Sequence, residues 1–156
     1  MLYPIGIQTF SDIREGGYVY VDKTAQIYNL ASTGKYYFLS RPRRFGKSLL
    51  VSTMEAYFKG KKELFEGLAI ASLEKEWTEY PVLHFDLGGR AYDRGDVLEK
   101  TLDDAIYKWE GEYGIDNSSD ILGIRFSNVI ESACRTTGRQ VVILIDEYDK
   151  PIIDNL

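Results

Sequence analysis

The sequence has few of the residues that mark secreted and disulfide-rich proteins: one cysteine, four prolines and one histidine in 156 residues. The single thiol, Cys134, cannot form an internal disulfide, which excludes a disulfide scaffold and fits a reducing cytoplasm. Charged residues interrupt every apolar run before it reaches the roughly 20 residues of a membrane span. Because the first ten residues also lack the basic and apolar regions of a signal peptide, we expect a cytoplasmic protein without a membrane segment.

The residues that are present are typical of one globular domain. Hydrophobic residues make up 44% of the chain and charged residues 28%, and no repeat or linker divides it. A chain of this length buries roughly 70% of the surface that it exposes when unfolded, which is enough for a core. The net charge of −5 is uneven, because residues 35–62 contain eight basic residues and one acid. That basic segment is either a solvated face or part of an anion-binding site.

Apolar periodicity predicts an alternation of strands and helices. Short apolar or alternating runs predict strands at Tyr18–Val21, Tyr36–Ser40, Pro81–Leu87 and Val141–Ile145. Apolar residues at helical spacing predict helices from Asp22 to Gly34, from Lys47 to Gly60, from Asp96 to Trp109, and from Leu122 to just before Gly138. Helices that alternate with buried strands indicate an α/β fold with a mainly parallel sheet.

A candidate phosphate-binding loop lies between the second predicted strand and the helix that follows it. The segment Arg41-Pro42-Arg43-Arg44-Phe45-Gly46-Lys47-Ser48 matches the Walker A pattern G-x-x-x-x-G-K-[ST], except that Arg41 replaces the first glycine. Gly46 allows a close backbone approach, Lys47 can reach the β- and γ-phosphates, and the Ser48 hydroxyl can bind Mg²⁺. Taken alone, the segment is also compatible with an ordinary strand-to-helix turn and a solvated lysine.

A pair of acids follows the last predicted strand, as in a Walker B motif. Asp146 and Glu147 lie at its carboxyl end, where open α/β sheets bind ligands. Asp146 is suited to hold Mg²⁺ opposite Ser48, and Glu147 to orient or deprotonate an attacking water. The alternative is a pair of surface acids. Asp86, which ends another predicted strand, and Asp149, which follows the Asp-Glu pair, are further acids that could assist in the site.

Six stretches together make the chain resemble the AAA-ATPase-like family of P-loop NTPases, bacterial and archaeal proteins often fused to a C-terminal PD-(D/E)XK nuclease-type domain. They are Gly6–Gln8, Tyr20–Thr24, Arg41–Ser48, Leu64–Leu68, Pro81–Asp86 and Leu144–Pro151. The family also lacks the first glycine of the loop. The resemblance implies a three-layer α/β/α fold. It also implies an ATP site in which Ser48 and Asp146 hold Mg²⁺ and Lys47 and Glu147 act in catalysis. The nucleotide-binding residues that it implies are Arg43, Arg44, Phe45, Gly46, Lys47, Ser48 and Leu49.

The resemblance also implies a sheet of strand order 5-1-4-3-2, in which a fourth strand separates the Asp146 strand from the strand before Arg41. That strand follows the Asp-Glu strand in sequence, and residues 148–156 are too few to supply it. We therefore expect residues 1–156 to be the N-terminal part of a longer ATPase domain. The alternative is a homo-oligomer or a partner chain that completes the sheet.

The sequence thus predicts an ATPase that requires Mg²⁺ and acts with an effector, such as a nuclease-like domain that contacts nucleic acid, beyond these residues. The alternative is a non-catalytic nucleotide-binding or interaction module with a vestigial pocket. A kinase-type P-loop enzyme fits less well, because the additional acid of the Asp-Glu pair suits hydrolysis.

Overall fold

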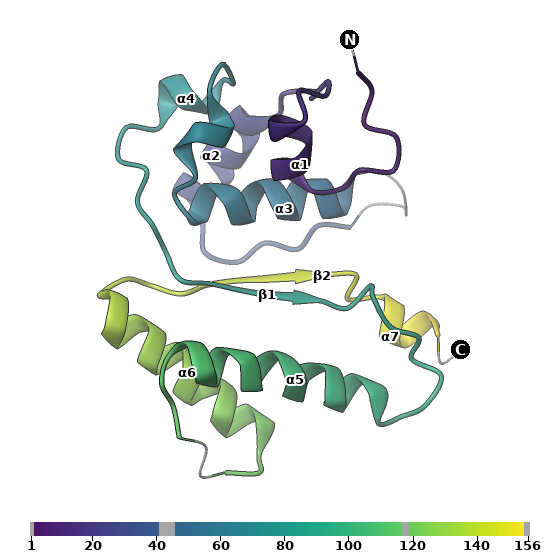
Figure 1. The fold of residues 1–156 in the computed structure, drawn as a ribbon. Helices are drawn as coiled ribbons and strands as arrows, with labels where there is room; N and C mark the ends of the chain where they lie inside the picture. Colours follow the sequence, from purple (N-terminus) through teal and green to yellow (C-terminus); the bar gives the residue numbers. More distant parts are fainter. Residues whose placement is uncertain (1, 41–45, 117–118, 155–156) are drawn as a thin grey trace. The chain divides into compact units, whose positions relative to one another are not determined.

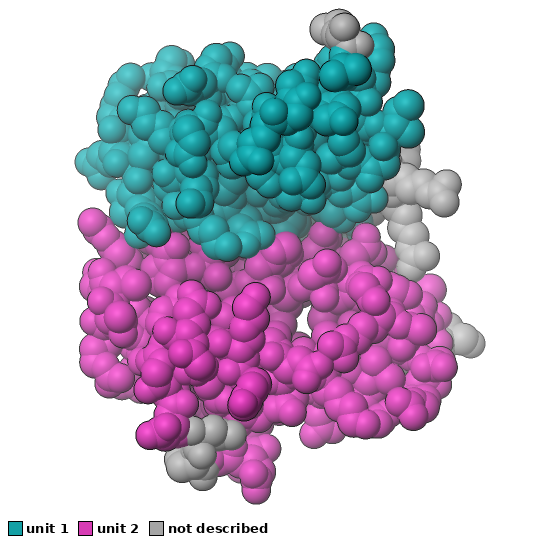
Figure 2. All heavy atoms as spheres, viewed as in Figure 1, with its two compact units in different colours: residues 1–79 teal, residues 80–156 magenta. Residues whose placement is uncertain are grey.

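The computed structural model describes residues 2–40, 46–116 and 119–154. The chain divides into two compact units, residues 1–79 (unit 1) and residues 80–156 (unit 2) (Figure 2). The described part of unit 1 consists of helices: α1 (Phe10–Glu15), α2 (Thr24–Thr33), α3 (Lys47–Phe58), the 3₁₀ helix η1 (Lys62–Phe65) and α4 (Ile70–Leu73). Unit 2 contains β1 (Val82–Asp86), α5 (Val97–Glu112), α6 (Leu122–Thr137), β2 (Val142–Asp146) and α7 (Lys150–Ile153) (Figure 1).

An aromatic cluster holds the helices of unit 1 together. The Phe10 and Phe65 side chains are fully buried, and their ring centroids lie 4.8 Å apart. The Trp77 ring contacts Phe65 on another side, at 5.2 Å. The first residue of α1 also contacts α3 directly, because the Phe10 N–H donates to the Ser52 hydroxyl at 2.9 Å. Helix α3 is therefore fixed by a core that uses the apolar face predicted from its sequence.

A single carboxylate links the starts of two helices in unit 1. Asp22 Oδ1 accepts hydrogen bonds from the backbone N–H and the hydroxyl of Thr24, at 2.9 and 2.7 Å, and Oδ2 accepts from the Ala69 N–H at 2.7 Å. Thr24 is the first residue of α2, and Ala69 is the N-cap of α4. Partial burial opposes ionisation of Asp22, but these hydrogen bonds outweigh it and hold the pKa of the carboxyl below its usual value.

The sheet of unit 2 is a parallel pair covered on one face by α5 and α6 (Figure 1). The register pairs Val82 with Val142 and ends with Asp86 beside Asp146. Phe85 lies against the two helices, with its ring 4.7 Å from Trp109 and 5.4 Å from Phe126. The bounds of both strands follow the predicted ones closely, and the mixed α/β class with a parallel sheet is confirmed. In the strand order 5-1-4-3-2 that the resemblance implies, β1 corresponds to the second strand and β2 to the third, and these two strands are neighbours in that order as well.

A buried ion pair joins the two helices that cover the sheet. Arg125 of α6 donates from Nε and one terminal nitrogen to both carboxylate oxygens of Glu110 of α5, at 2.9 and 2.8 Å. The two side chains are 8% and 4% exposed, and the other terminal nitrogen of Arg125 binds Asp103, which is about half exposed. The hydrogen bonds with Glu110 are the main cause of a raised pKa of Arg125, so the guanidinium stays charged within the core.

Two of the predicted strands are wrong. Residues 36–40 form no strand, and Tyr36 and Phe38 are 94% and 76% exposed. The Tyr37 hydroxyl instead donates to the Leu30 carbonyl at 2.6 Å, which ties this segment to α2. In place of a strand at 18–21, the structure has one isolated bridge between Leu2 and Tyr18. Bulky or alternating side chains favour a strand because they pack on a sheet, and side chains as exposed as Tyr36 and Phe38 gain nothing from that preference.

We expect Asp22→Asn to lower the free energy of unfolding by about 1 kcal/mol above pH 5, because an amide cannot accept all of the hydrogen bonds that the carboxylate accepts. The native pKa of Asp22 is depressed, so its contribution is complete above the unfolded-state pKa and is lost as the pH falls through the native value. The difference between wild type and variant should therefore shrink on acidification. Urea unfolding at several pH values measures it, with the exposed Glu79→Gln as control; a pH-independent difference contradicts this account.

We expect Glu110→Ala to cost about 3 kcal/mol, because it leaves the Arg125 guanidinium buried without its main partner. Asp103→Ala removes the exposed partner of the same guanidinium and should cost less than about 1 kcal/mol. Denaturant unfolding of both variants makes the comparison. Equal losses would show that burial does not determine the strength of this ion pair.

Candidate functional site

The first half of the candidate site is the start of α3. Gly46 is the N-cap residue, with φ 73° and ψ 27°, a left-handed conformation that glycine adopts without strain. The Leu50 N–H donates to the Gly46 carbonyl at 3.1 Å, and the helix begins at Lys47. The N–H groups of the first helical turn have no carbonyl partner within the helix, and the helix dipole is positive at this end. The local geometry therefore suits an anion.

Lys47 and Ser48 open this helix, and Leu49 follows them. The Lys47 side chain is buried, with 9% of its surface exposed. The Lys47 ammonium group and the start of α3 both carry positive charge. A bound anion would be attracted by both. The other predicted loop residues, Arg43, Arg44 and Phe45, lie outside the described residues.

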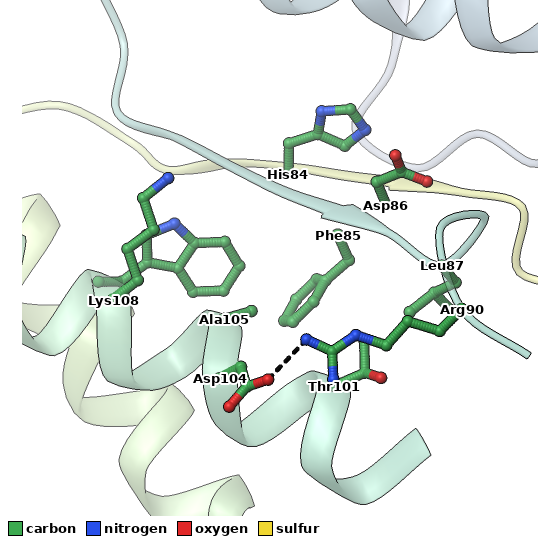
Figure 3. Close-up of a pocket in the computed structure, with 10 residues that line it drawn as sticks. His84, Phe85, Asp86, Leu87, Arg90, Thr101, Asp104, Ala105 and Lys108 are labelled. Carbon is green, nitrogen blue, oxygen red and sulfur yellow. Dashed lines mark hydrogen bonds and ion pairs between the residues drawn. The ribbon is translucent and has the colours of Figure 1, made fainter. Parts of the chain in front are cut away.

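The second half of the candidate site is the carboxyl end of the parallel sheet. Asp86 and Asp146 are the last residues of β1 and β2, and they are partners in the register. Figure 3 shows Asp86 on the opposite face of β1 from Phe85, which points toward α5. Register partners in a parallel pair direct their side chains to the same face, so the Asp146 carboxylate shares the face of Asp86. Asp86 is exposed, whereas Asp146 is only 6% exposed.

Backbone N–H groups hold both carboxylates at this end of the sheet. Asp146 Oδ1 accepts from the Glu147 N–H at 2.8 Å, and Asp86 Oδ1 accepts from the Gly88 N–H at 2.8 Å. The Leu87 N–H donates to the Asp146 carbonyl at 3.2 Å, which continues the strand pairing by one residue. These bonds fix the two loops that leave the sheet side by side.

Glu147 has an unusual backbone conformation. Its φ is 53°, in the left-handed region that residues other than glycine rarely adopt. The turn places its side chain beside Gly88: a Cβ built on Gly88 would lie 3.1 Å from Glu147 Cγ and 3.1 Å from Asp86 Oδ1. Sequence reasoning missed Gly88. The available signal was an Asp-x-Gly-Gly turn directly after a strand.

Two of the predicted site residues carry oxygen donors of a type that Mg²⁺ takes. The described residues contain no group of three or more His, Cys, Asp or Glu side chains that could hold a metal. Mg²⁺ in phosphate-transfer sites, however, commonly takes only one or two protein oxygens and completes its shell with phosphates and water. The Ser48 hydroxyl and the Asp146 carboxylate are hard oxygen donors of the kind this ion prefers.

The structure groups the predicted site residues into two sets. Gly46 to Leu49 follow one another at the start of α3 in unit 1, and Asp146 and Glu147 lie with Asp86 in unit 2. The expectation that the two sets meet around a triphosphate stays a prediction. Asp149, the other acid considered, is the N-cap residue of α7.

A cavity of about 320 Å³ lies alongside β1 and α5 within unit 2 (Figure 3). Asp86 belongs to its lining, as do the basic residues Arg90 and Lys108. The Arg90 guanidinium is paired with Asp104 at 2.7 Å, which reduces the positive charge that it presents. Neither Asp146 nor Glu147 lines this cavity, so it is separate from the two acids of the strand end.

Comparison with known proteins gives one family and one curated relative. The family model described as "Predicted AAA-ATPase" matches residues 4–156. An "Uncharacterized protein in vnfD 5'region" of Azotobacter chroococcum mcd 1 is 44% identical over 155 residues, which cover 98% of this chain and 30% of the relative. The chain thus spans less than a third of the length of that protein. No solved structure matches, and no helix among the described residues is long and apolar enough to cross a membrane.

Proposed function

The chain belongs to the AAA-ATPase-like family, and from this premise we propose that it binds ATP with Mg²⁺ and supplies the nucleotide-binding part of an ATP hydrolase. The observation that carries the proposal is the start of α3, where a left-handed Gly46 leads directly into Lys47 and Ser48. This arrangement presents backbone N–H groups, a helix dipole and an ammonium group to one anion. A triphosphate is the anion that the family and the Gly-Lys-Ser sequence favour.

Each residue in the proposed site has a distinct task. Lys47 binds the β- and γ-phosphate oxygens, and Gly46 and Leu49 face the phosphates from the N-cap and the first turn of α3. Arg43, Arg44 and Phe45, which precede Gly46 in sequence, are the other residues proposed to bind the nucleotide. The Ser48 hydroxyl and the Asp146 carboxylate would hold Mg²⁺, and the bound ion would neutralise charge on the phosphates. These tasks require the start of α3 and the end of β2 to face the same nucleotide.

Glu147 is the proposed proton acceptor for the attacking water. It directly follows Asp146, the acid that would hold Mg²⁺, and its carboxylate would take the proton of the attacking water. A positioned general base commonly contributes 10²- to 10⁴-fold to a rate. In this proposal, Asp146 contributes to charge stabilisation and Glu147 to proton transfer.

We further propose that hydrolysis requires residues beyond this chain. The curated relative is much longer than the matched region, and cationic groups that contact the γ-phosphate commonly contribute 10³- to 10⁵-fold to the rate of related reactions. The present residues alone would then bind ATP but hydrolyse it slowly. An effector domain in the same gene product, nuclease-like and directed at nucleic acid, is the partner that the family resemblance favours.

We expect Mg²⁺-ATP to stabilise the protein against thermal unfolding, by about 2.7 kcal/mol at a nucleotide concentration one hundred times the dissociation constant. Lys47→Ala should abolish most of this gain, because it removes the ammonium group from the phosphate site. Lys59→Ala, at the other end of the same helix and paired with Glu55 at 2.6 Å on the surface, is the matched control. Differential scanning fluorimetry with and without Mg²⁺-ATP measures the shifts.

Two outcomes of that experiment would count against the proposed pocket. The wild-type protein would show no shift with Mg²⁺-ATP, or the shift would survive intact in Lys47→Ala. Either result would favour the alternative, an interaction module in which the pocket is vestigial.

We expect Glu147→Gln in the full gene product to lower kcat for ATP hydrolysis by about 10²-fold or more, because an amide cannot accept the proton of the attacking water. The thermal shift with Mg²⁺-ATP should persist, since glutamine keeps the size of the side chain. Glu112→Gln, which removes an exposed carboxylate from α5, serves as control. Unchanged turnover in Glu147→Gln would remove Glu147 from the catalytic role.

A further inference from the structure

We propose that Gly88 is a positioning residue for the Glu147 carboxylate, and that the Asp86 turn holds Gly88 in place for this task. The inference rests on the proposed function, in which Glu147 accepts a proton from water. It concerns the loop after β1, to which neither the family match nor the Walker motifs assign a role.

The space beside Gly88 is occupied by Glu147. A Cβ on residue 88 would lie 3.1 Å from Glu147 Cγ and 3.6 Å from Glu147 Cβ. Ordinary carbon–carbon contacts begin near 3.5 Å, so any side chain at this position would push against Glu147. A glycine at residue 88 therefore leaves room for the observed rotamer of Glu147.

Glu147 is also the neighbour that would have to move. Asp86 Oδ1, at 3.1 Å from the same Cβ position, is held by its 2.8 Å hydrogen bond from the Gly88 N–H. The Glu147 Cβ is fixed by a backbone in the left-handed conformation, with φ 53°. The remaining freedom is rotation about the Cα–Cβ bond of Glu147, which would carry Cγ and the carboxylate away from their present place.

The adjacent glycine provides an internal contrast. A Cβ on Gly89 would meet no atom within 4 Å. Neither Gly88 nor Gly89 has a φ in the left-handed region, so alanine fits the backbone at both positions. Only the contact with Glu147 and Asp86 distinguishes the two substitutions.

Gly88→Ala and Gly89→Ala in the full gene product test the proposal. We expect Gly88→Ala to lower kcat for ATP hydrolysis by roughly 10- to 100-fold, as a misplaced catalytic group does. KM, the melting temperature and the shift of that temperature with Mg²⁺-ATP should stay close to wild type. Gly89→Ala should keep kcat within about twofold of wild type.

A double variant separates positioning from a general loss of structure. If Gly88 acts through Glu147, then Gly88→Ala combined with Glu147→Gln should be no slower than Glu147→Gln alone. Asp86→Ala gives a second test in which residue 88 remains glycine. It removes the acceptor of the Gly88 N–H and should reduce kcat several-fold. Combined with Glu147→Gln, it should not lower kcat further.

The possible failures are distinguishable. Near-wild-type kcat in Gly88→Ala, an equal loss in Gly89→Ala, or a fully additive loss in the double variants would overturn the positioning role and leave the proposed function intact. Wild-type turnover in Glu147→Gln would overturn both.

Discussion

The parallel pairing of β1 with β2 is the constraint on which the strand-end site depends. Because side chains alternate along a strand, the register that buries Leu83 and Phe85 against α5 and α6 also sets Asp86 beside Asp146 on the other face. A slip of one residue would expose the Phe85 ring to water and move Asp86 out of line. The packing of Phe85 on Trp109 and Phe126 therefore also determines which face of the sheet the two acids occupy.

The two halves of the proposed site rest on separate cores. The start of α3 depends on the aromatic cluster around Phe10 and Phe65, together with the hydrogen bond between Phe10 and Ser52. The carboxylates depend on the sheet and on the α5–α6 pair, which the Arg125–Glu110 ion pair holds together. Each half of the proposed site is therefore supported by contacts within its own unit.

Sequence reasoning predicted the elements whose signals are local. The helix that begins at Lys47 has a clear helical period, and β1 and β2 are short apolar runs whose bounds lie within one residue of the predicted ones. It failed at residues 36–40, where bulky side chains indicated a covered strand, but Tyr36 and Phe38 are exposed. It also could not foresee the bond between Asp22 and Ala69, or the contact between Gly88 and Glu147, because both join residues far apart in the chain.

The left-handed backbone conformation of Glu147 lowers the stability of the fold at the residue proposed to accept a proton. A residue other than glycine or asparagine in this conformation commonly costs 1 kcal/mol or more. Redesign of the chain for heat resistance that considers only the folded state would tend to replace Glu147 with glycine or asparagine, which adopt this conformation at lower cost, and would remove the carboxylate with it.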